Sequence, residues 1–212
     1  MRSARAFVPE EATRDVLTAQ ATDSVTAGVR LQQSRRLDWR FLLPDPRLGA
    51  IGYFGPQDET LLAALREFSS SVEALDWEHE REAAFDGVVV KQPASARLLA
   101  QAAQAVRPGG FLYVELRRKP RQALVGHSRT YRAALIRAGF EEPEYHWHWP
   151  DFERCTRFVP LNVPGPLMFD LSNGARGPRR FFFSAAARVA VASGLLARVV
   201  PCISLIATRV GR

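Results

Sequence analysis

Two histidines, separated by one residue, are the first side chains in this sequence that could carry chemistry. His146 and His148 alternate with aromatic residues in the segment 145–149. Residues i and i+2 share a face of a β-strand, so the two imidazoles could bind one metal ion. A third ligand would have to come from elsewhere, for example Glu153 or Cys155, and no H-x-x-x-H or C-x-x-C spacing supports such a site. The pattern favours an amphipathic strand, and we expect no metal ligand.

Nucleophilic and phosphate-binding motifs are also weak. His127 precedes Ser128, but there is no G-x-S-x-G sequence and no identifiable acid partner, so a hydrolase triad is not expected. The glycine pair 109–110 precedes a predicted strand and does not join a strand to a helix, which argues against a Walker-type phosphate loop. Cys155 and Cys202 are better explained as small buried apolar residues. We therefore expect no catalytic residue of these kinds.

A second group of candidates consists of two glycines, two carboxylates and one amide near the predicted ends of strands. They are Gly52, Gly55, Asp76, Asp86 and Gln92. Ligands of open α/β sheets bind at the carboxyl ends of the strands, so these residues could hold a nucleoside ligand. The alternative is that they serve only turns and solubility.

The position of these candidates depends on an alternation of strands and helices in the middle of the chain. Continuous apolar runs, such as 111–116, suit a parallel sheet that is covered on both faces. The pattern predicts an α/β fold with a doubly wound, mostly parallel sheet. We expect helices that begin at 58 and cover 95–106 and 127–138, and strands near 49–54, 71–75, 86–91, 110–116, 143–149 and 202–209, the last antiparallel.

The order of these elements resembles the class I S-adenosylmethionine-dependent methyltransferases. The most specific match is the segment 106–114, VRPGGFLYV, which looks like the helix-to-strand junction of that family. The resemblance covers roughly residues 48–149 and 195–209. Further matches are to the family's fourth strand, to the A-G-F before its sixth strand and to its last, antiparallel strand, at residues 85–89, 138–140 and 201–207.

The resemblance implies a glycine-rich turn and an acid that bind the cofactor, and the sequence departs from this pattern. A G-x-G-x-G turn would let the backbone approach the methionine part of the cofactor. Here the corresponding run 52–58 is GYFGPQD, with Tyr53 and Phe54 between its glycines and with Pro56 lacking a backbone donor. The family also places an acid at the end of its second strand to bind the ribose hydroxyls, and Asp76 matches that position.

A stretch of the family's core is missing after this acid. Nine residues, 77–85, separate Asp76 from Asp86. A crossover helix followed by a strand needs a dozen residues or more, so we expect that one β-α unit is deleted. The sheet should then have about six strands, one fewer than the resemblance implies, and the adenine pocket should lack a wall.

The chain is expected to carry additional segments around this core. We divide it into an N-terminal arm (1–47), the core (48–149), an irregular and helical insertion (150–200) and a final core strand (201–212). Residues 1–36 look loosely helical, and 37–46 contain two prolines and are expected to be extended. Three consecutive phenylalanines, Phe181–Phe183, cannot share one core face of a helix. We therefore expect that residues 150–200 contact a protein partner or a second copy of the chain.

Composition limits the remaining possibilities. With 212 residues, of which 47% are hydrophobic and 24% charged, the chain has an ordinary globular composition. It has no uncharged apolar run long enough to span a membrane, no evident signal peptide and only two cysteines, so we expect a cytoplasmic protein. The net charge of +7 comes from scattered arginines. Because nucleic-acid binding needs a localised basic face, we expect no nucleic-acid partner. We also expect no membrane partner, because an apolar helix with flanking arginines, as over 181–200, more often belongs to a core or to a partner contact.

These observations favour a methyltransferase-like protein with a degraded cofactor site. The leading hypothesis is a non-catalytic binding or scaffolding subunit of a biosynthetic or modifying enzyme complex, with no cofactor expected. The alternative is an active S-adenosylmethionine-dependent methyltransferase that acts on a small molecule or a peptide. A nucleic-acid binder is a third hypothesis and rests only on the charge.

Overall fold

The computed structural model describes residues 28–31, 33–78, 81–117, 125–161, 163, 165 and 200–211. Most of the N-terminal arm lies outside this part of the chain. So do residues 166–199, which include Phe181–Phe183 and most of the segment in which we expected a partner contact.

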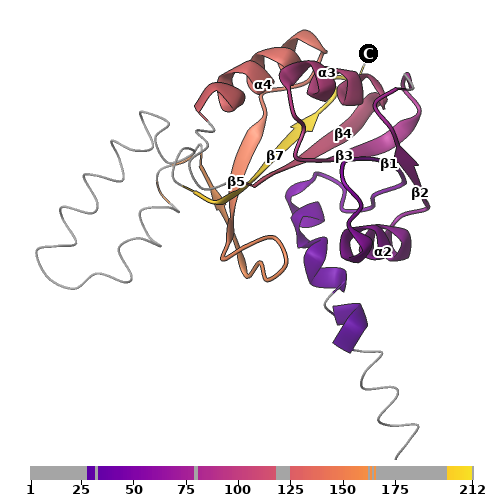
Figure 1. Ribbon diagram of the computed structural model, residues 1–212, viewed down its shortest axis with the longest axis vertical. Helices are drawn as coiled ribbons and strands as arrows, with labels where there is room; N and C mark the ends of the chain where they lie inside the picture. The colour runs from indigo at the N-terminus through magenta and orange to yellow at the C-terminus, as the bar shows by residue number, and fades with distance from the viewer. Residues whose placement is uncertain are drawn as a thin grey trace, which may run out of the picture.

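The core of the protein is a seven-stranded sheet of order β2-β1-β3-β4-β7-β5-β6 (Figure 1). The strands β2, β1, β3 and β4 are parallel, and β7 runs antiparallel to both of its neighbours, β4 and β5. The predicted α/β fold with a mostly parallel sheet and a reversed last strand is confirmed. The bounds are β1 Ala50–Phe54, β2 Ser71–Leu75, β3 Phe85–Lys91, β4 Val106–Arg117, β5 Glu144–Trp149, β6 Arg157–Pro160 and β7 Cys202–Thr208.

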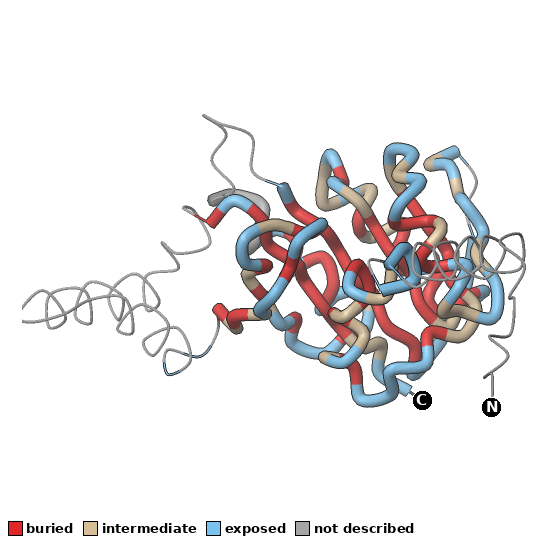
Figure 2. Tube along the Cα trace, turned by 90° about the horizontal axis from the view of Figure 1, so that it is seen from below, coloured by how far each residue is buried: buried red, intermediate tan, exposed pale blue. Residues whose placement is uncertain are grey.

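Helices cover both faces of this sheet, and its strands form the buried centre of the molecule (Figure 2). Helix α2 (Glu59–Phe68) packs on one face, where it meets side chains such as Val89. Helices α3 (Ala96–Gln104) and α4 (Val125–Arg137) pack on the other, where they meet Val88 and Val90. Successive residues of a strand point to opposite faces, so a continuous apolar run supplies both layers of the core.

The connection from β2 to β3 is as short as the sequence predicts. Among the residues described there, 77–78 and 81–84, none is in a helix or a strand. The Trp77 ring stacks on Phe54 with 4.7 Å between ring centroids, and the Trp77 carbonyl oxygen accepts a hydrogen bond of 2.8 Å from Gln101 Nε2. Trp77 thus packs beside α3. Among the described residues, no strand lies beyond β2 in the order of the sheet, so β2 is an edge strand.

Three expectations differ from the structure. The sheet has seven strands and not six, because β6 returns along β5 as an antiparallel neighbour in the region expected to be irregular. Strand β4 starts at Val106, so residues 107–110 belong to the strand and do not separate it from α3. In the segment expected to be extended, Asp38–Leu42 forms a 3₁₀ helix, η1; both prolines follow this helix and do not interrupt its hydrogen bonds.

The described end of the N-terminal arm lies against the same sheet face as α2. Residues 28–31 and 33–36 are helical, and Leu37, Trp39 and Leu48 are fully buried in the same cluster as α2. This described end of the arm is therefore part of the core and brings Arg36 to the sheet. In the described part of the chain, no helix is long and apolar enough to cross a membrane.

Candidate functional site

Three of the five candidate residues lie together at the carboxyl edge of the parallel strands. Gly55, Asp76 and Gln92 directly follow β1, β2 and β3. Gly52 lies within β1, where a Cβ atom would stand 2.9 Å from both Leu75 Cδ1 and Phe85 Cδ2, so its position serves close packing of the core.

Asp86 lies at the opposite edge of the sheet from these three residues, because it is the second residue of β3. Its Oδ2 accepts a hydrogen bond of 2.6 Å from the backbone of Ala50, and its Oδ1 pairs with Arg107. The expectation that Asp86 lies at the carboxyl ends of the strands, near the other four candidates, is therefore corrected. The two residues begin and end the same strand, and Asp86 joins the amino ends of neighbouring strands.

The turn after β1 depends on one glycine. Gly55 has φ +143°, and a Cβ atom there would stand 2.8 Å from the backbone oxygen of Lys91, so only glycine permits this approach. Tyr53 and Phe54, which we expected to obstruct the turn, are buried strand residues on opposite faces of the sheet. The Tyr53 hydroxyl donates a hydrogen bond of 2.6 Å to the Pro56 carbonyl and thereby closes the turn with a contact from the chain itself.

The other two edge residues are exposed to solvent. The Asp76 Oδ1 atom accepts a hydrogen bond of 3.1 Å from the Glu78 amide. Gln92 has φ +52°, and its backbone N–H donates a hydrogen bond of 2.8 Å to the backbone carbonyl of Glu115. These two hydrogen bonds fix the chain after β2 and after β3, and both side chains lie at the surface of this edge.

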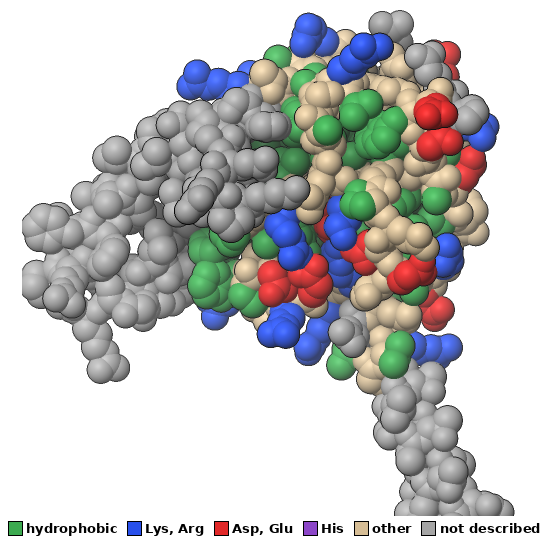
Figure 3. All heavy atoms as spheres, viewed as in Figure 1, with side chains coloured by type: hydrophobic (Ala, Val, Ile, Leu, Met, Phe, Trp, Pro, Cys, Tyr) green, Lys and Arg blue, Asp and Glu red, His purple; other side chains and the backbone are tan. Residues whose placement is uncertain are grey.

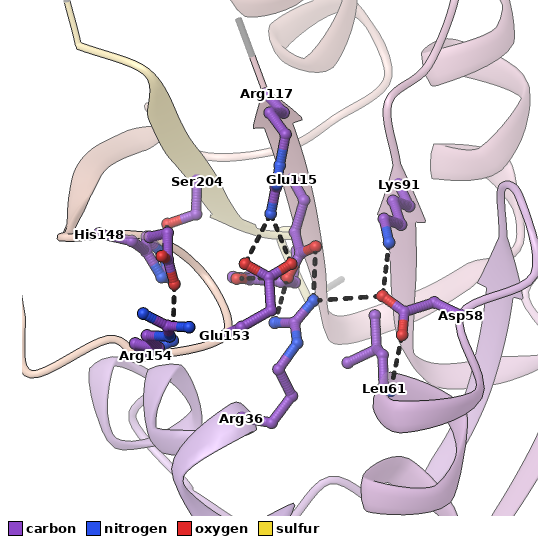
Figure 4. Close-up of polar contacts among 12 residues, drawn as sticks. Arg36, Asp58, Leu61, Lys91, Glu115, Arg117, His148, Glu153, Arg154 and Ser204 are labelled. Carbon is purple, nitrogen blue, oxygen red and sulfur yellow. Dashed lines mark hydrogen bonds and ion pairs between the residues drawn. The ribbon is translucent and has the colours of Figure 1, made fainter.

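Beside this edge lies a cluster of two cations and two anions that we call the four-charge cluster: Arg36, Asp58, Lys91 and Glu115 (Figure 4). Arg36 forms a bidentate pair with Glu115, with Nη1–Oε1 and Nη2–Oε2 distances of 2.5 and 2.8 Å. The Asp58 Oδ2 atom lies 2.5 Å from Lys91 Nζ and 3.7 Å from Arg36 Nη2. The arm, the start of α2 and the ends of β3 and β4 are thus joined by charge.

The cluster is buried most deeply at its central pair. The side chains of Arg36 and Glu115 are 2% and 1% exposed, whereas those of Lys91 and Asp58 are 18% and 14% exposed. Removing one partner of a buried ion pair leaves the other charge uncompensated and typically costs about 3–5 kcal/mol. The central pair therefore holds the arm onto the sheet, and the outer pair forms its boundary with solvent.

The electrostatics hold Arg36 and Asp58 in their charged forms. Burial opposes the charge of Arg36, but the Glu115 carboxylate outweighs it and raises the pKa of Arg36 above its ordinary value. Burial likewise opposes the charge of Asp58, but hydrogen bonds from Lys91 and from the Leu61 amide lower the pKa of that carboxyl below its ordinary value. Burial and the charge of Glu115 raise the pKa of Tyr113 well above its ordinary value. These groups hold their protons or charges firmly near neutral pH, which disfavours general acid–base chemistry by them.

The N-terminus of α2 is occupied by the chain's own carboxylate. Helix N-termini attract anionic groups because their amide donors are unpaired. Here the Asp58 Oδ1 atom accepts a hydrogen bond of 3.0 Å from the Leu61 amide, and its Oδ2 atom is neutralised by Lys91. An anionic ligand would have to displace this carboxylate to reach the helix end.

Aromatic residues and the two histidines complete the surroundings of the cluster. The Trp39 ring stacks on Tyr113 at 3.9 Å between centroids, with 9° between the ring planes. His148 Nε2 lies 2.8 Å from Ser204 Oγ, and burial, followed by the charge of Arg36, lowers the pKa of His148 to about 3. His146 is also buried. In the part of the chain that the structure describes, no group of three His, Cys, Asp or Glu side chains could hold a metal ion.

The four-charge cluster was not predicted from the sequence. One signal was available, because Glu115 interrupts the continuous apolar run 111–116, and a carboxylate within a buried strand requires a compensating charge. The partner could not be chosen from the sequence, since Arg36 is one of many arginines and lies 79 positions away.

No protein-family model and no curated protein matches the sequence. Among solved structures, the chain is similar to a SAM-dependent methyltransferase from Archaeoglobus fulgidus, with 11% identity, 84% of this chain and 94% of that chain covered, and a TM-score of 0.48. It is also similar to a possible histamine N-methyltransferase from Thermotoga maritima, with 11% identity, 90% and 96% coverage, and a TM-score of 0.43.

A third similar structure is considerably longer than this chain. It is phosphoethanolamine N-methyltransferase 2 of Haemonchus contortus in complex with S-adenosyl-L-methionine, with 14% identity and a TM-score of 0.46. The match covers 84% of this chain but only 53% of that protein. The chain thus spans about half the length of that methyltransferase.

The class of protein follows from the sheet itself. Parallel strands in the order β2-β1-β3-β4, followed by the reversed β7 and then β5, are joined by helices on both faces. The sequence motifs lie where the resemblance requires, with the segment 106–114 in β4 and the reversed final strand at Cys202–Thr208. The protein has a class I methyltransferase-like α/β fold.

Proposed function

We propose that this protein is a methyltransferase-like subunit that does not catalyse methyl transfer and acts by binding or scaffolding other proteins of a biosynthetic or modifying enzyme complex. The observation that carries the proposal is the buried Arg36–Glu115 pair beside the carboxyl edge. Arg36 of the arm neutralises the Glu115 carboxylate of β4, and Trp39 of the same arm covers Tyr113. The chain's own side chains fill a region where an α/β enzyme would receive its ligand.

Two other features support the loss of the cofactor. The turn after β1 retains one glycine at the edge and is closed by the Tyr53–Pro56 hydrogen bond. The connection after Asp76 is too short to hold the β-α unit that, in the resembling family, supplies the adenine-contacting loop.

The alternative proposal is an active S-adenosylmethionine-dependent methyltransferase with a shortened site. The observation in its favour is that Gly55, Asp76 and Gln92 share one edge and that the last two are exposed. The Asp76 carboxylate could accept hydrogen bonds from ribose hydroxyls, as the family resemblance implies.

Calorimetric titration of the full chain with S-adenosylmethionine decides between the two proposals. For the non-catalytic subunit we expect no saturable heat of binding up to millimolar cofactor. Near-UV circular dichroism of the same sample should show packed aromatic side chains, which include Trp39 and Tyr113. The matched control is Asp76→Asn, which keeps the shape of the side chain and removes its charge. Micromolar binding by the wild type that is lost in Asp76→Asn would establish the alternative.

The partner is proposed to contact residues 150–200, as the sequence analysis suggests. The test is reconstitution with proteins encoded beside this one, measured by size-exclusion chromatography with light scattering. Alanine at Phe182 should weaken a defined complex more than it lowers the melting temperature of the free protein. Equal loss of complex and stability would indicate that the segment belongs to the protein's own core.

A further inference from the structure

An open groove runs along α3 to the amino edge of the sheet, at the opposite end from the four-charge cluster. Its volume is about 1350 Å³, and it is lined by α3, by the end of α4 and by the chain before β3 and after β7. Four alanines line it: Ala96 and Ala100 of α3, Ala134 of α4 and Ala138, which directly follows α4. The exposed side chain of Val210 adds an apolar wall.

Arginines dominate the charged lining of this groove. Arg81, Arg97, Arg137 and Arg209 line it, and Glu82 is the one acidic residue among its described lining residues. Arg81 pairs with Glu73 at 2.9 Å, a contact at the surface. For the other three arginines, no described carboxylate lies within ion-pair distance.

Several arginines elsewhere in the molecule do have carboxylate partners. Arg107, Arg117 and Arg132 each pair with a carboxylate. In Figure 3, blue side chains at the top of the view, over α4, stand apart from red ones, whereas blue and red alternate around the lower part of the sheet. The groove is therefore a region of uncompensated positive charge within the described surface.

The fold accounts for the placement of Arg137 and Arg209, which contact backbone carbonyls, but not for that of Arg97. Arg97 is exposed in the first turn of α3, where a positive charge opposes the helix dipole. Arg137 and Arg209 donate to backbone carbonyls, at 3.0 Å to Ala133 and 3.2 Å to Gln104. Such contacts use one or two of the five N–H donors of each guanidinium, so further donors remain for a ligand.

We propose that this groove docks an acidic amphipathic helix of a partner protein. Carboxylates of the helix would pair with Arg97, Arg137 and Arg209, since arginine binds carboxylates in a bidentate manner. Its small apolar side chains would enter the alanine-lined floor. The groove exceeds the usual 300–1,000 Å³ of a small-molecule pocket, which suits a polypeptide segment.

Two features favour a polypeptide over a nucleic acid. No aromatic residue is among the described residues that line the groove, whereas single-stranded nucleic acids are bound by stacking on aromatic side chains. Glu82 and the apolar floor would also face a phosphate backbone unfavourably. The proposal goes beyond the function proposed above, because it uses no residue of the carboxyl edge and holds whether or not the protein binds a cofactor.

The test measures binding of a fluorescein-labelled peptide to the full chain by fluorescence anisotropy. The probe has about 14 residues, with glutamates on one side and alanines and leucines on the other, and spans roughly 21 Å as a helix. A second probe replaces every glutamate by glutamine, and a third is a single-stranded oligonucleotide of the same charge. The variants are Arg97→Glu/Arg137→Glu and, as a control with the same charge change on exposed arginines outside the groove, Arg47→Glu/Arg66→Glu.

We expect that the acidic peptide binds the wild type and the Arg47→Glu/Arg66→Glu control, and that binding weakens at high salt because screening reduces the attraction. The groove variant should bind at least about tenfold more weakly, which corresponds to about 1.4 kcal/mol, with an unchanged melting temperature. Absence of peptide binding, equal loss in both variants, or tighter binding of the oligonucleotide would each overturn the proposal. A parallel cofactor titration should be the same for all variants, which separates this outcome from that of the proposed function.

Discussion

The two edges of one parallel sheet differ in how they manage their charges. At the carboxyl edge, the arm places Arg36 against Glu115 in a pair that is almost completely buried. At the amino edge, three arginines of the open groove, Arg97, Arg137 and Arg209, have no carboxylate partner among the described residues. The edge where an α/β enzyme usually binds its ligand thus carries a charge cluster that is neutralised within the protein, and the opposite edge presents arginines without a described carboxylate partner.

This difference has a simple physical origin. A buried charge loses its hydration free energy, so a partner within the protein must compensate for this loss. An exposed arginine keeps its hydration and can stay unpaired until a partner arrives. The comparison predicts that substitutions in the four-charge cluster chiefly change stability, whereas substitutions in the groove at the amino edge chiefly change binding.

The largest effect is expected for Arg36→Ala. The change leaves the Glu115 carboxylate buried without its bidentate partner, and we expect a loss of about 3–5 kcal/mol in the free energy of unfolding, measured by urea denaturation. The double variant Arg36→Met/Glu115→Leu removes both charges and should recover most of this loss. A cost below about 1 kcal/mol for Arg36→Ala would show that the arm contributes little to the fold.

The next effect concerns pH. Burial lowers the pKa of His148 to about 3, against about 6.5 in the unfolded chain, so between these values the unfolded state binds more protons than the folded state. Stability should therefore fall as the pH is lowered from about 6.5 towards 3, with a limiting slope of about 1.4 kcal/mol per pH unit for one group.

Urea denaturation at a series of pH values measures this slope, and His148→Gln provides the control. Glutamine cannot titrate, so the variant should show a shallower decline. The lowered pKa of His146 contributes in the same direction and should leave a residual slope. An identical slope in the wild type and in His148→Gln would assign the acid sensitivity to other groups.

A smaller effect is expected for Asp58→Ala. The variant loses the N-cap of α2 and the partner of Lys91, and capping residues typically contribute about 0.5–2 kcal/mol. Asp58→Asn retains an acceptor for the Leu61 amide and should recover part of the loss. If the two variants are equally destabilised, the charge contact and not the cap is the dominant contribution.

The smallest effect is expected for Asp76→Ala, which tests whether the carboxyl edge still has a function. An exposed carboxylate without a ligand contributes within about 0.5 kcal/mol, so thermal melting should hardly change. The alternative proposal predicts the same melting temperature together with loss of cofactor binding and activity. Loss of activity with unaltered melting would refute the non-catalytic assignment.

Much of the fold was predictable from local patterns. The strands over Ala50–Phe54, Ser71–Leu75 and Phe85–Lys91 agree with the predicted ranges to within a residue, because short apolar runs bounded by glycine or by helix-capping residues have few other conformations. The nine residues between Asp76 and Asp86 are too few for a β-α unit, and their number alone gave this prediction. Strand β6 was missed because its four residues carry no periodic signal and become a strand only beside β5.

The sequence by itself determined the alternation of strands and helices, the short connection after Asp76 and the single glycine turn at Gly55, since each depends on residues that are close in the chain. Only the tertiary structure decided that Asp86 lies at the opposite edge, that Arg36 neutralises Glu115, and that arginines from separate segments surround one groove. These are contacts between distant residues, and a charged side chain takes its role from what surrounds it after folding. The same residue type therefore neutralises a buried carboxylate at one edge of the sheet and lines an open groove at the other.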